Sequence, residues 1–166
     1  MGHNNKEKIL KLYFENPEKK FTIREISYKT KVPKSSVHRI LSELKKEKIV
    51  SKDGEFIRNN LSQIKKINFY IEKIVSSGLL EYLVEKLNPS SIILFGSIRK
   101  GDSVKDSDVD IFVETCVEKK MDFVNFEKKI GHKIELFLET DINNLQKNLY
   151  NNIINGISLF GGLKLK

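Results

Sequence analysis

The sequence predicts an α+β fold in two parts, on three observations. Apolar residues follow a helical period up to about residue 48, after which strand-like runs begin. Beyond residue 88, short apolar runs alternate with polar and helical stretches. Basic residues outnumber acidic ones by 15 to 8 in residues 1–58, but only by 15 to 14 in residues 59–166. The uneven charge indicates two parts with different partners.

Composition and charge exclude several classes of protein. Apolar residues make up 39% of the chain, enough for a core, which argues against wholesale disorder. The lone Cys116 excludes a disulfide framework and a zinc site built from several cysteines. No apolar run approaches the roughly 18 residues of a membrane span, and the polar N-terminus lacks a signal core. We therefore expect a cytoplasmic protein. Its basic excess suggests a phosphate backbone or an anionic membrane surface as partner, or a merely solvated face.

Three short helices are predicted in the basic part. The first runs from about Lys6 to Glu15. The second covers about Ile23 to Thr30 and begins at a capping box made by Thr22 and Glu25. A third helix follows a short turn, and its apolar residues have the i, i+3, i+4, i+7 spacing of one buried stripe: Val37, Ile40, Leu41 and Leu44.

A β-hairpin is predicted after the third helix. Asp53-Gly54 separates two strand-like runs, 49–52 and 55–58, and this dipeptide favours a type I′ turn, which needs positive φ. Three helices and a hairpin resemble the winged helix-turn-helix of many archaeal and bacterial regulators. The segment VPKSSVHRILSELKKEKIV is similar to that family's turn, recognition helix and first wing strand. The resemblance implies a DNA-binding domain over residues 1–58, with the start of the third helix in the major groove.

The residues expected to contact DNA lie on the third helix, away from its buried stripe, and on the wing. Serine and lysine suit phosphates, and Arg39 is suited to read a guanine edge. The alternative is that these are ordinary surface charges on a protein-docking module. The predicted DNA-binding residues are Lys34, Ser35, Ser36, His38, Arg39, Lys52 and Arg58.

Residues 61–87 predict a helical connector that is interrupted at Ser76-Ser77-Gly78. Its isoleucines repeat with 3-4-3 spacing, which fits packing against a flanking domain or a short homodimer contact. The isoleucines concerned are Ile64, Ile67, Ile71 and Ile74.

An acidic pair marks the chemistry of the second part. Ser91–Phe95 predicts a buried strand, and the next strand opens with Asp108-Val109-Asp110. Residues two apart on a strand face the same side, so the two carboxylates project together. Like charges this close repel unless a proton or cation lies between them, and oxygen ligands favour Mg²⁺ or Mn²⁺. The spacing does not fit an EF-hand, because Ile111 and Val117 occupy its Gly and Glu positions.

A third strand is predicted over Lys133–Leu138, after a helix at about Met121 to Ile130. Glu135 is its only acid, in an apolar segment where a buried carboxylate needs a partner. The Asp108 and Asp110 pair, or its metal, would supply one.

These motifs together resemble the minimal nucleotidyltransferases of the DNA polymerase beta-like superfamily. LFGSIRKGDSVKDSDVDIFV matches their Gly-Ser, Gly-Asp and Ser-Asp-x-Asp motif, and KIELFL matches the strand with their third carboxylate. NNIINGISLFG is similar to their final helix and the Gly turn after it. Ile98 stands where many members have Arg, and Arg99 and Lys100 follow it. The resemblance implies a nucleotidyltransferase domain over residues 79–166, with a small mixed sheet flanked by helices, joined to the first domain by a connector over residues 59–78.

The resemblance also implies a function. The enzyme would transfer a nucleoside monophosphate, with ATP as the expected donor, to a hydroxyl group. Members of this group act as antitoxins that add AMP to a HEPN-type toxin, and others are toxins that modify tRNA. We expect the acceptor to be a partner protein and the DNA-binding module to repress the protein's own operon. One alternative is an enzyme that modifies tRNA. The other is a regulator whose second domain is inactive or only senses nucleotide. Asp108, Asp110 and Glu135 would be catalytic and metal-binding, and Gly96, Ser97, Arg99 and Lys100 would bind the nucleotide.

Overall fold

The computed structural model describes residues 2–165, with side chains from residue 4 onward, and the chain forms two compact units. The first comprises residues 1–65 with 103–106, and the second comprises residues 66–102 with 107–166. Helix α4 (Asn60–Ser77) contributes residues to both units. Each unit has a hydrophobic core of its own.

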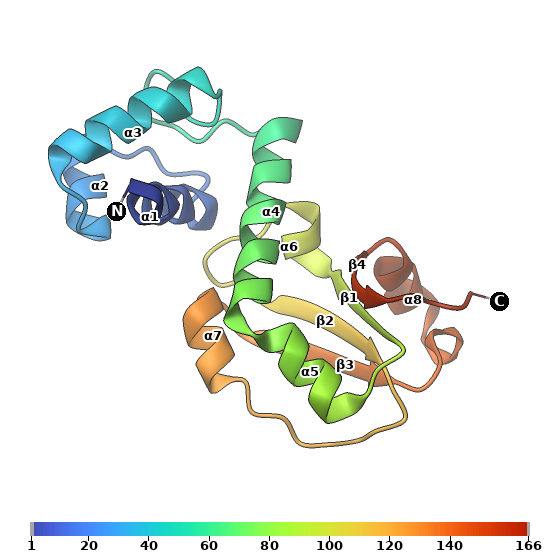
Figure 1. Cartoon of the computed structure of the whole chain (residues 1–166). Helices are drawn as coiled ribbons and strands as arrows, with labels where there is room; N and C mark the ends of the chain where they lie inside the picture. The colour runs from blue at the N-terminus through green and yellow to red at the C-terminus, as the bar shows by residue number, and fades with distance from the viewer. Residues whose placement is uncertain (1, 166) are drawn as a thin grey trace. The chain divides into compact units, whose positions relative to one another are not determined.

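Three helices form most of the first unit: α1 (Gly2–Glu15), α2 (Ile23–Thr30) and α3 (Lys34–Lys46) (Figure 1). The predicted capping box is present at the start of α2. The Thr22 hydroxyl accepts from the Glu25 amide, and the Glu25 carboxylate accepts from the Thr22 amide at 2.8 Å. The apolar stripe of α3 is buried as predicted, in a core that includes Ile9, Tyr13, Ile26, Val37, Ile40, Leu41 and Leu44.

The wing is shorter than predicted, and the type I′ turn is wrong. Left-handed backbone occurs at Gly54 (φ +84°) and not at Asp53. The Gly54 amide donates to the Ser51 carbonyl at 3.1 Å, and the Ser51 hydroxyl accepts from the amides of Asp53 and Glu55. That hydroxyl stabilises a three-residue loop that requires one left-handed residue instead of two. The two sides of the wing then pair at an isolated bridge between Val50 and Phe56.

The connector is helical and is interrupted as predicted. Helix α4 ends at Ser77, Gly78 is left-handed (φ +86°), and α5 covers Leu79–Leu87. The isoleucine seam does not keep one environment along α4, because Ile74 is buried whereas Ile64 is 54% exposed. The homodimer contact therefore stays a prediction. No helix within residues 2–165 is long and apolar enough to cross a membrane.

A four-stranded mixed sheet is the centre of the second unit as far as the chain is described. Its order is β3-β2-β1-β4, with β1 antiparallel to both β2 and β4 and with β2 parallel to β3. The strands are β1 (Ser91–Phe95), β2 (Val109–Glu114), β3 (Ile134–Glu139) and β4 (Ile157–Gly161). The small mixed sheet is confirmed, but no strand was predicted at the position of β4.

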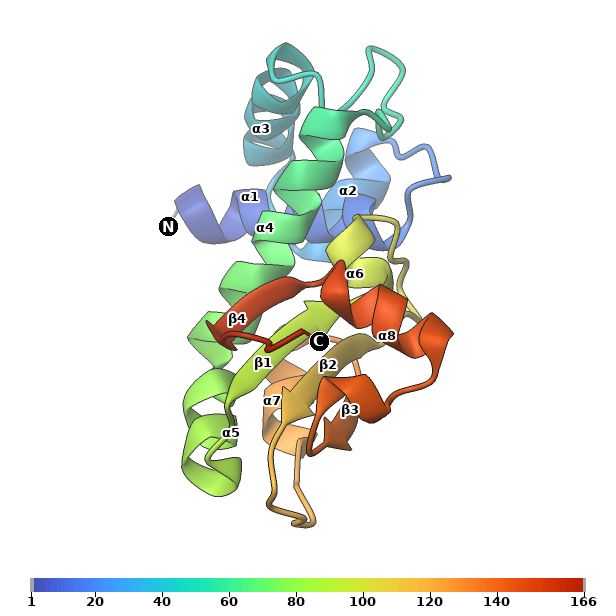
Figure 2. The same ribbon diagram turned by 90° about the vertical axis from the view of Figure 1, so that its right-hand side faces the viewer.

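Helices cover both faces of this sheet. Figures 1 and 2 show α5 and α7 (Val124–Ile130) on one face and α8 (Lys147–Ile154) on the other. Phe112 and Ile93 pack with Ile153 of α8 in one core cluster. Helix α7 begins later than predicted, where the Asp122 carboxylate accepts from the Val124 amide. The remaining elements are α6 (Gly96–Lys100) and a short 3-10 turn (Ile142–Asn144).

Candidate functional site

The structure brings the three predicted carboxylates to neighbouring positions of the sheet. Asp108 directly precedes β2, Asp110 is the second residue of β2, and Glu135 is the second residue of β3. The parallel register pairs Asp110 with Glu135. Because side chains alternate along a strand, these acids lie on the face that continues through Phe112 and Phe137 toward α8.

The pKa of the Asp110 carboxyl is raised by its surroundings. Burial, then the charge of Glu135, then that of Asp108 raise the pKa of the Asp110 carboxyl from 3.8 to about 6. A hydrogen bond from the Ser97 amide opposes this rise, whereas a side-chain hydrogen bond with Glu135 adds to it. The site therefore favours a proton, or another positive charge, beside Asp110.

Glu135 has a different environment from the one predicted. Strand β3 is at an edge of the sheet, so Glu135 is exposed rather than buried in an apolar segment. Its carboxylate can therefore be solvated and does not need a partner to offset burial. Its partnership with Asp110 comes from the strand register and their shared hydrogen bond.

The Gly-Ser turn holds Asp110 directly. Phe95 pairs with Asp110 across the two strands, so Gly96 is the next residue along. Gly96 is left-handed (φ +69°), and a Cβ on it would lie 1.8 Å from Asp110 Oδ2. Its amide neighbour Ser97 donates to the same carboxylate. Only glycine meets both requirements, so the packing of the acidic site by itself requires glycine at a position that was predicted to bind the nucleotide.

Positive charge follows this turn on the short helix α6. Ile98, at the position where the resemblance leads one to expect Arg, is fully buried. Arg99 is partly exposed and Lys100 is exposed. Cationic contacts from this helix to a triphosphate would therefore have to come from Arg99 and Lys100.

The donor chemistry of the site fits a hard divalent cation. Three carboxylates provide oxygen ligands of the kind that Mg²⁺ and Mn²⁺ prefer. A cation near Asp110 would also relieve the repulsion that raises its pKa. Within the described part of the chain, no three acidic, histidine or cysteine side chains are already arranged to hold a metal. Because the pKa of Asp110 is raised to about 6, metal binding at this site should compete with protons more strongly below pH 6 than above it.

A basic groove lies beside the recognition helix in the first unit. Its volume is about 420 Å³, and Phe21, Ile23 and Leu41 contribute its apolar lining. Two of the predicted DNA-binding residues, His38 and Lys52, line it. Two further lysines line it that were not predicted as DNA contacts. Lys20 precedes α2 and Lys45 is on the last turn of α3, and only the tertiary fold brings them together with Lys52 of the wing.

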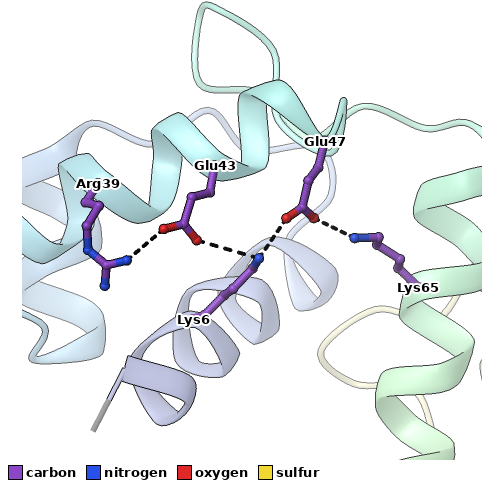
Figure 3. A network of polar contacts seen from close by, with 5 residues as sticks. All are labelled: Lys6, Arg39, Glu43, Glu47 and Lys65. Atoms are coloured by element: carbon purple, nitrogen blue, oxygen red, sulfur yellow. Dashed lines mark hydrogen bonds and ion pairs between the residues drawn. The ribbon is translucent and has the colours of Figure 1, made fainter.

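The opposite flank of α3 carries an ion-pair network (Figure 3). Arg39 donates to Glu43 at 2.7 Å. Lys6 of α1 lies 3.7 Å from Glu43 and 2.8 Å from Glu47, and Lys65 of α4 also binds Glu47. These two lysines lower the pKa of the Glu47 carboxyl. The predicted bidentate contact of Arg39 with a guanine would compete with this ion pair, which holds one of its two terminal nitrogens.

The other predicted DNA contacts are distributed around the same unit. Lys34 and Ser35 are exposed in the first turn of α3, and Ser36 is half-buried there. Arg58 forms an ion pair with Glu18. Exposed ion pairs of this kind contribute little stability, so they can open when a phosphate competes for the cation.

Two protein families match the chain. Residues 78–162 match the family described as "Polymerase beta, Nucleotidyltransferase", and this stretch includes the Gly-Ser turn and all three carboxylates. Residues 12–54 match the "IclR helix-turn-helix domain", which includes α2, α3 and the wing turn. No curated protein and no solved structure shows significant similarity to the chain.

Proposed function

The chain belongs to the polymerase beta nucleotidyltransferase family, and we propose that it transfers a nucleoside monophosphate from a nucleoside triphosphate to a hydroxyl group, with ATP as the donor. The observation that carries this proposal is the pairing of Asp110 with Glu135 beside Asp108, at a glycine turn that only a residue without Cβ can make. A structural role for these acids would not require three carboxylates to share one face of a sheet.

The reaction forms one bond and breaks one. The acceptor oxygen attacks the α-phosphorus, the bond from that phosphorus to the bridging oxygen breaks, and pyrophosphate leaves. Asp108, Asp110 and Glu135 would hold Mg²⁺ or Mn²⁺, which when bound neutralises the triphosphate and aligns the acceptor. Glu135 is exposed and can take the proton of the acceptor hydroxyl. Arg99 and Lys100 would stabilise the charge that develops on the leaving pyrophosphate.

We favour a protein as acceptor. Residues 59–166 carry 15 basic and 14 acidic residues, whereas an enzyme acting on tRNA would be expected to present a basic surface. Together with a DNA-binding domain, this balance supports a cytoplasmic antitoxin-like enzyme that modifies a HEPN-type toxin partner. A tRNA acceptor is the alternative, and the label-transfer assay described below distinguishes it by separating labelled RNA from labelled protein.

The N-terminal unit is an IclR-type helix-turn-helix domain, and we propose that it binds the operator of its own gene. The basic groove of Lys20, His38, Lys45 and Lys52 supports a phosphate contact beside α3. Affinity for the upstream DNA should fall with salt. A Lys45→Ala/Lys52→Ala variant should lower both the affinity and its salt dependence, whereas an unchanged salt slope would remove the groove from the interface.

Label transfer tests the enzymatic proposal. The full chain, Mg²⁺ and α-labelled ATP are incubated with a lysate of the source organism, and labelled products are separated into protein and RNA. Transfer should require Asp108 and Asp110, so the Asp108→Ala/Asp110→Ala variant should give none. If neither protein transfers label from any of the four nucleotides, the second candidate is favoured, a regulator with an inactive or sensing domain. Buried Ile98 in place of the usual Arg is the observation behind that candidate.

A further inference from the structure

The backbone on each side of Asp108 is held by two consecutive residues of one segment. The Val109 amide donates to the Lys133 carbonyl at 2.8 Å, where the ladder between β2 and β3 begins. One step earlier, the Ser107 carbonyl lies 2.6 Å from Nδ1 of the His132 ring. A side chain thus extends the contact between these segments beyond the ladder, to the peptide that joins Ser107 to Asp108.

Both nitrogens of the His132 ring are engaged. A carbonyl can only accept, so the ring carries a proton on Nδ1 and donates it to Ser107. Nε2 lies 3.0 Å from the Tyr70 hydroxyl, which donates to it when the ring is neutral. The Tyr70 and His132 rings also meet edge to face, with centroids 5.0 Å apart.

Burial makes this arrangement specific. His132 is 5% exposed and Tyr70 is fully buried. A ring that is packed and hydrogen-bonded at both nitrogens has one orientation available, so it can fix the plane of the peptide that it binds. This peptide consists of the Ser107 carbonyl and the Asp108 N–H. Its orientation sets the direction in which the Asp108 side chain leaves the backbone.

We infer that His132 is a positioning residue for Asp108. It is not one of the proposed metal ligands. Through Ser107 it holds the Asp108 carboxylate toward Asp110 and Glu135, and Tyr70 fixes the orientation of the ring. This role rests on the proposed function, because the acids it serves are the proposed metal ligands. Outer contacts that orient metal ligands typically alter metal affinity by about tenfold or more when they are removed.

Two substitutions separate positioning from packing. In His132→Asn, the side-chain amide takes the place of Nδ1 and can still donate to Ser107. In His132→Gln, the side-chain amide takes the place of Nε2, keeps its reach to Tyr70 and removes the hydrogen bond from residue 132 to the Ser107 carbonyl. Both variants remove the ring, so a merely structural role would affect them alike.

The full-length proteins are compared by two measurements. Electron paramagnetic resonance of free Mn²⁺ gives the affinity for Mn²⁺ alone, and amide relaxation gives the order parameter of the Asp108 N–H. We expect His132→Gln to bind Mn²⁺ about tenfold more weakly and to lower the order parameter from about 0.85 toward 0.6. His132→Asn should retain most of both values.

The inference is overturned if the two variants lose Mn²⁺ affinity equally, or if the Asp108 order parameter is unchanged in His132→Gln. Failure of the proposed function looks different. In that case the wild-type protein binds no Mn²⁺. The order parameter of the Asp108 amide still shows whether His132 holds Asp108.

Discussion

Replacing Asp110 by Asn should stabilise the metal-free second unit near neutral pH while it abolishes nucleotidyl transfer. The pKa of the Asp110 carboxyl is raised from 3.8 to about 6, so the native state holds its proton more tightly than the unfolded chain does. The unfolded carboxyl is fully ionised above about pH 5, whereas the native one ionises only near pH 6. The free energy of unfolding of the wild-type protein therefore falls as the pH rises from about 4 to 6. Above about pH 6, the full destabilisation by the ionised Asp110 is present.

The rise in the pKa of Asp110 sets the size of the stability change expected for Asp110→Asn. One pKa unit corresponds to about 1.4 kcal/mol, so a rise from 3.8 to about 6 sets an upper bound of about 3 kcal/mol. Asp110 is only partly buried, and solvent screening reduces this to about 1 kcal/mol. In a unit of roughly 100 residues, that free energy corresponds to a rise in Tm of about 4 °C. Asparagine removes the charge but can still accept from the Ser97 amide and donate to Glu135.

Thermal unfolding without metal, followed by circular dichroism, measures this effect. Asp110→Asn should melt about 4 °C above the wild type at pH 7.5, and the difference should vanish near pH 4. Asp106→Asn, at an exposed acid in the turn before β2, is the matched control and should leave Tm unchanged. A variant that melts below the wild type at pH 7.5, or a difference that does not depend on pH, would show that the charge of Asp110 does not destabilise the native state.

Three further predictions concern other parts of the chain. Gly96→Ala and Gly78→Ala both place alanine at a left-handed position, which costs about 1–2 kcal/mol. Gly96→Ala should lose more stability than Gly78→Ala and should also lose activity, because only at position 96 would the new Cβ meet Asp110. Equal losses of stability in the two variants would contradict the close contact between Gly96 and Asp110. Glu43→Gln should free Arg39 and tighten DNA binding at low salt, as measured by fluorescence anisotropy, and unchanged affinity would place Arg39 outside the interface. Thr22→Ala should destabilise the helix-turn-helix unit by about 1 kcal/mol through loss of the capping box, a shift detectable in denaturant titration.

The elements that local chemistry determines could be predicted from the sequence. The capping box at Thr22 and the buried stripe of α3 depend on spacing within one helix, and both are confirmed. The bounds of β1 are also as predicted, because a wholly buried strand is a continuous apolar run. The last strand, β4, was missed because its burial alternates and its pairing with β1 is a long-range contact.

The parts that failed depend on contacts between distant or competing groups. The Asp-Gly signal in the wing was overridden by the Ser51 hydroxyl, which satisfies two amides and permits a different loop. Glu135 was expected in a buried strand, but strand order leaves β3 at the sheet edge. The clash that restricts position 96 to glycine arises from Asp110, and only the register of two strands reveals it.

The most direct test of the central claim compares ATP labelled at the α-phosphate with ATP labelled at the γ-phosphate, in the presence of Mg²⁺ and lysate. A nucleotidyltransferase that uses Asp108, Asp110 and Glu135 should transfer the α label to an acceptor and release the γ label as pyrophosphate. The Asp108→Ala/Asp110→Ala variant should transfer neither label. Transfer of the γ label that depends on the added protein, or transfer of the α label by that variant above the level of lysate alone, would show that these carboxylates do not catalyse nucleotidyl transfer.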